Sequence, residues 1–166
     1  MGPPRSRIDV PHDARDLPGD FAHRCEVEVR LSDTDAMGHV NNARYLTYVE
    51  IARVAYHEAV IGKPLPLGVH GAEEGMILAE IRMTYRAQAY FGERLTVETR
   101  IDRIGNTSFT MVHRVTAPES RYGAARLVAT SEAILVSFDY GTDQPIPVPD
   151  DWRAAIAAYE GWEPAR

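Results

Sequence analysis

Four segments in the second half of the chain have the two-residue periodicity of β-strands. Apolar and polar residues alternate over Ile77–Tyr85, Leu95–Ile101 and Phe109–Val115, and an apolar-rich run follows at Leu127–Phe138. This alternation is typical of strands that bury one face. Short, turn-like stretches join the segments: YFGE, RIGN and APESRYG. Because a parallel crossover needs a dozen or more residues, strands joined in this way must be antiparallel.

One long helix is predicted before these strands, over Asn42–Val60. Its apolar residues recur at three- and four-residue spacing, and Gly62 and Pro64 mark its end. The opposite face also carries few charges, so we expect the helix to be buried on more than one side. The apolar stripe consists of Tyr45, Leu46, Val49, Ala52, Tyr56, Ala59 and Val60.

A first strand is predicted upstream of the helix, at Arg24–Leu31. Its apolar residues, Cys25, Val27, Val29 and Leu31, alternate with charged residues. The elements together predict an α+β fold in which a five-stranded antiparallel sheet wraps around one long central helix and buries it.

The domain organisation follows from length and from the Pro-rich stretches. A chain of 166 residues is long enough for one domain with a real core. Residues 1–20 are polar and contain several prolines, which predicts a flexible leader. Residues 21–140 then form the folded domain. Residues 141–166 form a Pro-rich linker and a short C-terminal helix that Asp150 or Asp151 would cap.

Composition excludes several classes of function. A net charge of −6 argues against general binding to nucleic acid. No stretch approaches the roughly 18 consecutive apolar residues of a membrane helix, so no membrane partner is expected. The single cysteine, Cys25, cannot form an internal disulfide, which fits a cytoplasmic protein.

The connection between the first strand and the helix concentrates polar and charged residues. Ser32–Asn42 reads SDTDAMGHVNN. Each of these residues on its own is compatible with a simple helix entry, because Asp and Asn cap helices and Gly relieves strain. A calcium loop of the EF-hand type is rejected, because Met37 and Arg44 occupy positions that require oxygen ligands.

A catalytic interpretation of the same connection rests on its expected geometry. A strand that leads directly into a helix directs the first free N–H groups of the helix at one spot, with the positive end of the helix dipole behind them. Such a spot stabilises a carbonyl oxygen that gains negative charge. An aspartate just before the helix is expected to be ionised there, so it can attack an acyl carbon or take a proton from water. This pairing suits hydrolysis of an ester or a thioester.

The stretch DTDAMGHVNNARYLTYVEIAR resembles the signature of the hot-dog-fold thioesterases, in particular the 4-hydroxybenzoyl-CoA thioesterase-like group. The resemblance covers about residues 25–138. It implies that Asp35 is the catalytic aspartate and that the backbone N–H of Asn42 polarises the thioester carbonyl. Gly38 and His39 would form the turn between them. The stretch is also similar to the plant acyl-ACP thioesterases, although their active-site asparagine would fall on Met37.

Other residues near the connection receive less specific roles. His39 is expected to affect turnover by orienting Asp35, by positioning water, or only by a hydrogen bond within the loop. Asn41 is expected to cap the helix or to contact the thioester end of the substrate. Asp33 is expected to form a turn or to hold the loop as a partner. Glu50 is predicted to form a structural ion pair with Arg53 rather than to act as the acid.

The resemblance also implies where coenzyme A lies. The nucleotide end of an acyl-CoA would lie near the hairpin Asp102–Phe109, where Arg103, Gly105, Asn106 and Thr107 are the candidate contacts. Coenzyme A enters as part of the substrate, and we expect no separate cofactor. Since no His, Cys and Asp set has metal-site spacing, we expect no metal.

The sequence therefore predicts a thioesterase that cleaves an acyl-CoA, or an acyl-ACP, to a free acid and a thiol. The resemblance implies a homodimer or homotetramer with the site at the subunit boundary. Two alternatives remain at this stage. One is a hot-dog hydratase or dehydratase that acts on acyl thioesters, and the other is a binding module for acyl thioesters without hydrolytic activity.

Overall fold

The structure is a computed structural model that describes residues 17, 19–63 and 74–161. Most of the predicted leader, residues 1–20, therefore lies outside the described residues, and so does the central part of the loop after the long helix. The predicted division of the chain into leader, domain and C-terminal segment stays a prediction.

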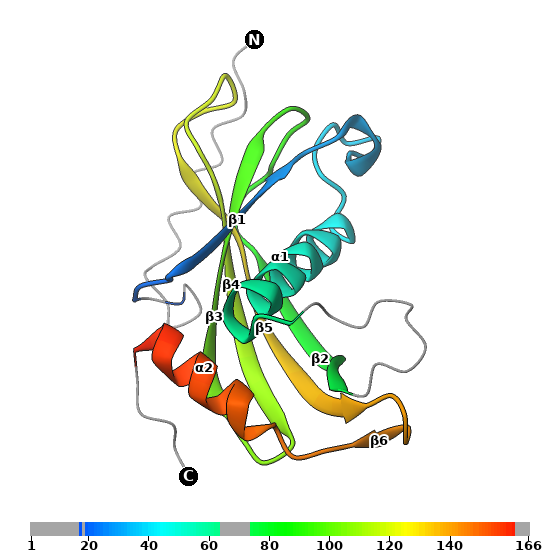
Figure 1. Cartoon of the computed structure of the whole chain (residues 1–166). Helices are drawn as coiled ribbons and strands as arrows, with labels where there is room; N and C mark the ends of the chain where they lie inside the picture. The colour runs from blue at the N-terminus through cyan, green and yellow to red at the C-terminus, as the bar shows by residue number, and fades with distance from the viewer. Residues whose placement is uncertain (1–16, 18, 64–73, 162–166) are drawn as a thin grey trace.

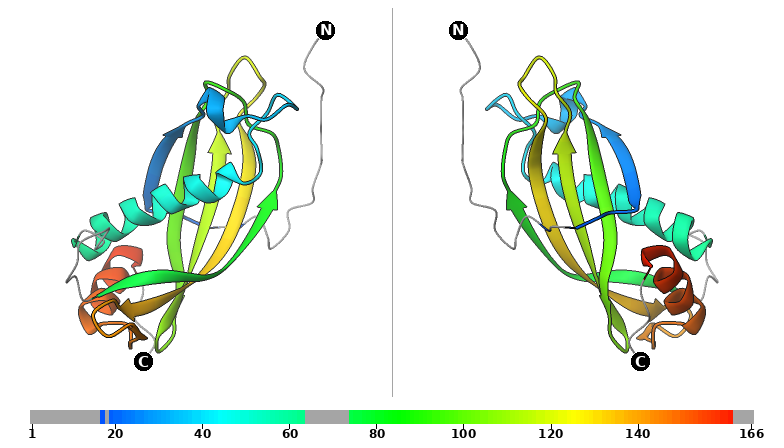
Figure 2. Two further views of the ribbon diagram at one scale, coloured as in Figure 1. Left: turned by 90° about the vertical axis from the view of Figure 1, so that its right-hand side faces the viewer. Right: turned by 90° about the vertical axis from the view of Figure 1, so that its left-hand side faces the viewer.

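The described residues form one antiparallel sheet and two helices (Figure 1). The strands pair in the order β1-β3-β4-β5-β2, so that β1 and β2 lie at the two edges. α1 lies across one face of the sheet, which curves around it (Figure 2). The predicted five-stranded antiparallel sheet around a central helix is confirmed. In chain order the elements are β1 His23–Glu28, the 3₁₀ turn η2 Leu31–Asp33, α1 Arg44–Ile61, β2 Glu74–Tyr85, β3 Arg94–Ile104, β4 Ser108–Ala117, β5 Arg126–Asp139, the short β6 Gln144–Pro145 and α2 Asp150–Glu160.

α1 is buried on one side only. It ends at Gly62, whose φ of 73° closes the helix with a left-handed residue. The prediction of burial on a second side is wrong for the single chain, because the sheet covers one face and the described elements leave the other open. Leu46 and Ile51 are therefore exposed, and so is Ala59. The buried residues of α1 are Tyr45, Tyr48, Val49, Ala52, Tyr56 and His57.

Two predicted strand faces are interrupted. β1 ends at Glu28, and the chain turns into η2, so Leu31 is 69% exposed rather than buried. In β2 a bulge between Leu78 and Glu80 adds one residue to the strand. Because side chains alternate between the two faces of a strand, the bulge moves Ile77 to the face opposite Ile81.

Two apolar clusters fill the space between α1 and the sheet. One surrounds the first half of α1, and the other surrounds Tyr56 and includes Trp152 and Ile156 of α2. α2 therefore packs against the core rather than extending from it. Pro149, not Asp150 or Asp151, occupies its N-cap position, and Asp151 instead pairs with Lys63 at 2.9 Å.

A row of polar side chains crosses the sheet between the two clusters. His23, Thr99, His113 and Ser131 are register partners on β1, β3, β4 and β5, and all four are buried. The imidazole of His113 is hydrogen-bonded through Nδ1 to the Ser131 hydroxyl at 2.9 Å. His113 is thus a packed core histidine, as its position on an apolar strand face predicts.

Candidate active site

The polar connection folds into a tight loop just before α1. Thr34 and Val40 form an isolated bridge that closes the loop. Within it, the N–H of Asp35 donates to the carbonyl of His39 at 3.1 Å, and the N–H of Gly38 donates to the carbonyl of Asp35 at 3.0 Å. Gly38 has a φ of 81°, a left-handed conformation that glycine adopts without steric cost. The sequence DAMGH therefore folds Asp35 back toward the start of α1.

Asp33 anchors this loop to the protein. Its carboxylate is fully buried and accepts hydrogen bonds from the backbone N–H and the guanidinium of Arg30. The hydroxyl of Tyr48 on α1 donates to it at 2.9 Å. Burial alone would raise the pKa of Asp33, but the hydrogen bonds from Arg30 and Tyr48 outweigh burial and hold the pKa below its ordinary value. No pattern in the sequence points to Tyr48, because its contact is 15 residues away along the chain.

Asp35 is oriented by its neighbours and remains partly exposed. Oδ1 accepts the backbone N–H of Met37 at 2.9 Å, and Oδ2 accepts the side-chain amide of Asn41 at 3.4 Å. The carboxylate therefore lies beside the residue that precedes Asn42. Unlike Asp33, it forms no ion pair within the described part of the chain.

An N–H group without a backbone acceptor, that of Asn42, lies just before α1. The helix begins at Arg44, two residues later than predicted, although Ala43 already has helical backbone angles. The side-chain oxygen of Asn41 accepts the N–H of Ala43 at 3.0 Å, and its backbone carbonyl accepts the N–H of Arg44 at 2.9 Å. Across the described residues, no backbone acceptor is found for the N–H of Asn42, which is exposed.

His39 is hydrogen-bonded to the loop itself. Its Nδ1 lies 3.2 Å from the carbonyl oxygen of Val40. Because a carbonyl oxygen only accepts, Nδ1 carries the proton in this arrangement. Among the described residues, no hydrogen bond joins the side chains of His39 and Asp35, and an effect of His39 on turnover stays a prediction.

Glu50 is located away from this loop, on the open face of α1. Its carboxylate pairs with Arg53 at 3.3 Å, which confirms the predicted ion pair. Glu50 lies eight residues beyond Asn42, or about 12 Å along the helix axis. It is therefore separated from the N-terminus of α1 by about two turns.

The hairpin that is predicted to bind the nucleotide end of the substrate lies at the end of the molecule opposite the Asp35 loop. Gly105–Thr107 joins β3 to β4 beside α2, whereas the Asp35 loop precedes α1 at the other end (Figure 1). Arg153 of α2 donates to the carbonyls of Gly105 and Asn106. Arg103 is exposed on β3. Within one chain, the structure brings Gly38 and Asn41 to Asp35 but does not bring the hairpin there.

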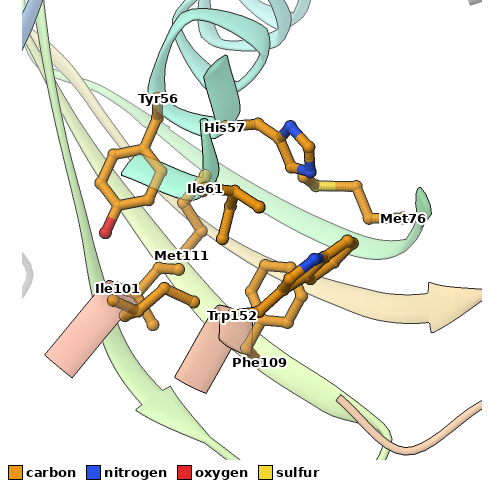
Figure 3. Close-up of a pocket in the computed structure, with 9 residues that line it drawn as sticks. Tyr56, His57, Ile61, Met76, Ile101, Phe109, Met111 and Trp152 are labelled. Carbon is orange, nitrogen blue, oxygen red and sulfur yellow. The ribbon is translucent and has the colours of Figure 1, made fainter. Parts of the chain in front are cut away.

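A small cavity lies near that hairpin, between the C-terminal half of α1 and α2 (Figure 3). The centre of a water molecule can occupy only about 10 Å³ of it, which is room for about one water. The cavity is too small for an acyl thioester and too far from Asp35 to serve that carboxylate. Its lining residues are Tyr56, His57, Ile61, Met76, Ile101, Phe109, Met111, Trp152 and Ile156.

Comparison with known families identifies the class of this fold. The model of the thioesterase-like superfamily matches residues 29–156, which include the Asp35 loop, α1 and all of the main strands after it. The chain belongs to the thioesterase-like superfamily, and its architecture is the hot-dog fold.

Individual relatives agree with this assignment. The chain is 31% identical to a thioesterase from Thermus thermophilus that was solved with coenzyme A and zinc; the match covers 86% of this chain and 97% of that one, with a TM-score of 0.71. It is 27% identical over 135 residues to the 1,4-dihydroxy-2-naphthoyl-CoA hydrolase of Synechococcus elongatus, covering 78% of this chain and 93% of that protein. A 1,4-dihydroxy-2-naphthoyl-CoA thioesterase from Synechocystis shares the fold, with a TM-score of 0.70 at 22% identity over 81% of this chain and 95% of that one.

Two further features concern the described residues: groups of side chains that could hold a metal ion, and helices that could span a membrane. No group of three or more His, Cys, Asp or Glu side chains that could hold a metal ion occurs among them. Neither of their helices has the length and apolar character needed to cross a membrane.

Proposed function

We propose that this protein is an acyl-CoA thioesterase with Asp35 as its catalytic carboxylate. The observation that carries the proposal is a partly exposed carboxylate that is oriented by Asn41, next to which the N–H of Asn42 has no backbone acceptor at the start of α1. Membership of the thioesterase-like superfamily supports it. The similar thioesterase solved with coenzyme A and the similar 1,4-dihydroxy-2-naphthoyl-CoA hydrolase support a CoA thioester as the substrate.

The proposed chemistry uses both groups at once. The thioester carbonyl oxygen accepts the N–H of Asn42, and the dipole of α1 adds to the stabilisation of the negative charge that develops there. Asp35 takes a proton from water while the water oxygen bonds to the acyl carbon. The C–S bond then breaks, and its electron pair stays on the sulfur. The proton held by Asp35 passes to this sulfur, which restores the carboxylate, and the products are a carboxylic acid and coenzyme A thiol.

A nucleophilic route uses the same groups in another order. An oxygen of Asp35 bonds to the acyl carbon, the thiolate leaves, and water then hydrolyses the resulting anhydride. Rapid quenching followed by mass spectrometry of the intact protein separates the two routes. Only the nucleophilic route adds the mass of the acyl group to the protein.

Binding of the nucleotide end of the substrate near Asp35 would require a second copy of the chain. The hairpin Gly105–Thr107 and the Asp35 loop lie at opposite ends of one chain, so we propose that a partner's hairpin completes each site. β2 is an exposed edge strand that carries the half-exposed Leu78, which makes it the natural pairing edge. We propose a cytoplasmic homodimer or homotetramer. Light scattering after size-exclusion chromatography tests this, and a monomeric mass would contradict it.

The central test is Asp35→Asn, which keeps the shape of the side chain and removes the charge. Thiol release from a panel of aliphatic and aromatic acyl-CoA and acyl-ACP substrates is expected to fall at least about a hundredfold. Asp150→Asn, an exposed aspartate on α2, is the matched control and should keep wild-type rates. Asn42→Ala should have a mild effect, because it retains the backbone N–H.

Three results would contradict the proposal. Wild-type rates in Asp35→Asn would remove Asp35 from the chemistry. Saturable binding of acyl-CoA without thiol release would indicate a binding module instead. Formation of an enoyl thioester without thiol release would indicate a dehydratase.

A further inference from the structure

Tyr85, the last residue of β2, connects the edge of the sheet to the start of α1. Its hydroxyl donates a hydrogen bond to the backbone carbonyl of Asn42 at 3.0 Å. Its ring makes an edge-on contact with the buried ring of Tyr45, with centroids 5.4 Å apart. Although Tyr85 is 47% exposed, its phenol is therefore fixed at both ends.

The hydroxyl of Tyr85 completes the set of hydrogen bonds around Asn42. The peptide group between Asn42 and Ala43 is held on both sides, because Tyr85 binds its carbonyl and the Asn41 side chain binds its N–H. The preceding peptide group is held at its carbonyl by the N–H of Arg44. Among the described residues, the N–H of Asn42 itself has no backbone acceptor.

These contacts bear on the direction of that N–H. The N–H of Asn42 belongs to the same peptide group as the Asn41 carbonyl, which accepts the N–H of Arg44. A peptide group whose carbonyl accepts a hydrogen bond has a more polarised N–H. A donor acts on a developing oxyanion only if it is directed at the right position, and an error of about 1 Å reduces the rate strongly. Asn41 and Arg44 are neighbours of Asn42 along the chain and move with it. Tyr85 is 43 residues away on a strand, so it holds Asn42 relative to the sheet.

We propose that Tyr85 is a positioning residue that holds Asn42 so that its N–H is directed at the substrate carbonyl. This inference rests on the proposed function. Tyr85 acts through the backbone of Asn42 rather than on the reacting atoms. Its loss should therefore lower kcat, leave KM nearly unchanged and leave the fold intact.

Tyr140 supplies a matched control within the same chain. Its hydroxyl also donates to a backbone carbonyl, that of Met76, at 3.2 Å, and its ring makes an edge-on contact with Phe138 at 5.3 Å. It is 48% exposed, almost the same as Tyr85. Tyr140→Phe thus removes an equivalent hydrogen bond at a position that plays no part in the site.

The kinetic test compares Tyr85→Phe with Tyr140→Phe in the full chain, using the acyl-CoA that the wild type hydrolyses fastest. Tyr85→Phe should lower kcat about tenfold or more, with KM within about twofold of wild type. Tyr140→Phe should leave both constants unchanged. Both variants should have similar melting temperatures and the wild-type shape of the pH–rate profile. An unchanged kcat in Tyr85→Phe, or a raised KM with unchanged kcat, would overturn the proposal.

A second measurement is independent of turnover. In ¹⁵N-labelled protein, the backbone amide resonance of Asn42 should move in Tyr85→Phe and stay in place in Tyr140→Phe. A shifted resonance in a chain that hydrolyses no thioester would contradict the proposed function and leave the contact standing. An Asn42 resonance that does not respond to Tyr85→Phe would overturn the positioning role, even where Asp35→Asn abolishes thiol release.

Discussion

Asp33 and Asp35 are two positions apart in the sequence and lie in opposite environments. Asp33 is buried and is bound by Arg30 and Tyr48, whereas Asp35 is partly exposed and is bound by a backbone N–H and an amide. A carboxylate that is already neutralised by a guanidinium cannot easily take a proton from water. These different partners support the proposed division of roles, in which Asp33 is structural and Asp35 is catalytic.

Replacement of Asp33 is expected to destabilise the protein. Asp33→Asn leaves the guanidinium of Arg30 and the hydroxyl of Tyr48 with a poorer acceptor in a buried site. Breaking such hydrogen bonds costs about 1–3 kcal/mol of unfolding free energy. Urea denaturation measures this loss, and Asp150→Asn serves as the exposed control. Equal stability of the two variants would show that Asp33 does not anchor the loop.

At the scale of elements, α2 makes the C-terminal segment part of the packed structure. Its sequence predicts a short helix after a Pro-rich stretch, and the structure packs that helix into the cluster around Tyr56. Trp152 and Ile156 are each about 1% exposed. Arg153 adds contacts to the β3–β4 hairpin, and Asp151 adds an ion pair with Lys63, two residues after the end of α1. α2 therefore belongs to the folded core.

A core role of α2 predicts a large effect of truncating one of its side chains. Ile156→Ala should lower the unfolding free energy by about 2–4 kcal/mol, because the lost contacts are buried. Ile51→Ala, on the exposed face of α1, should cost less than about 1 kcal/mol in the monomer. Thermal and urea unfolding of both variants provides the comparison. A similar small loss in both would mean that α2 is a dispensable appendage.

At the scale of the whole molecule, the buried histidines couple the fold to pH. Burial lowers the pKa of His23 and of His57. Burial, together with the positive charge of Arg53 and then of His23, lowers the pKa of His113 to about 3. The folded protein therefore keeps these histidines neutral where the unfolded chain would protonate them.

The direction of the pH effect follows from linkage. Above pH 6.5, the ordinary value, neither state protonates these groups, and their contribution to stability is fully present. As pH falls below 6.5, the unfolded chain binds protons that the folded protein does not bind, and for His113 this lowers the unfolding free energy by about 1.4 kcal/mol per pH unit. His23 and His57 change it in the same direction. The loss for His113 ends near pH 3. Asp33, with its lowered pKa, adds a further loss that begins as pH falls below its ordinary value of 3.8 and continues until the folded carboxylate is also protonated.

The prediction is a steady fall of unfolding free energy between about pH 6.5 and 4, measured by urea denaturation at each pH. In His113→Asn the side chain can still form a hydrogen bond with the Ser131 hydroxyl. This variant should reduce the slope of unfolding free energy against pH by about the contribution of one histidine. Ile51→Ala, on the exposed face of α1, removes no titratable group; it is the comparison variant and should keep the wild-type slope. A slope that His113→Asn does not change would show that this histidine is protonated in the folded protein.

The sequence by itself determined the elements and much of the architecture. Period-two segments with short links require antiparallel strands, and a single long apolar helix requires a surface that covers it. Local chemistry also marked the loop at Asp35, the turn at Gly38 and the pair of Glu50 with Arg53, because these contacts lie within a few residues of one another. Such short-range features are encoded by spacing and by backbone preference.

Only the tertiary structure decided the features that depend on distant partners. Neither the bulge in β2 nor the exposure of Leu31 can be read from alternation, since both depend on how neighbouring segments pair and turn. The contacts of Tyr48 with Asp33 and of Tyr85 with Asn42 join residues 15 and 43 positions apart. The physical reason is that folding brings together groups whose separation in sequence carries no local signal, and here those groups surround the proposed carboxylate and N–H.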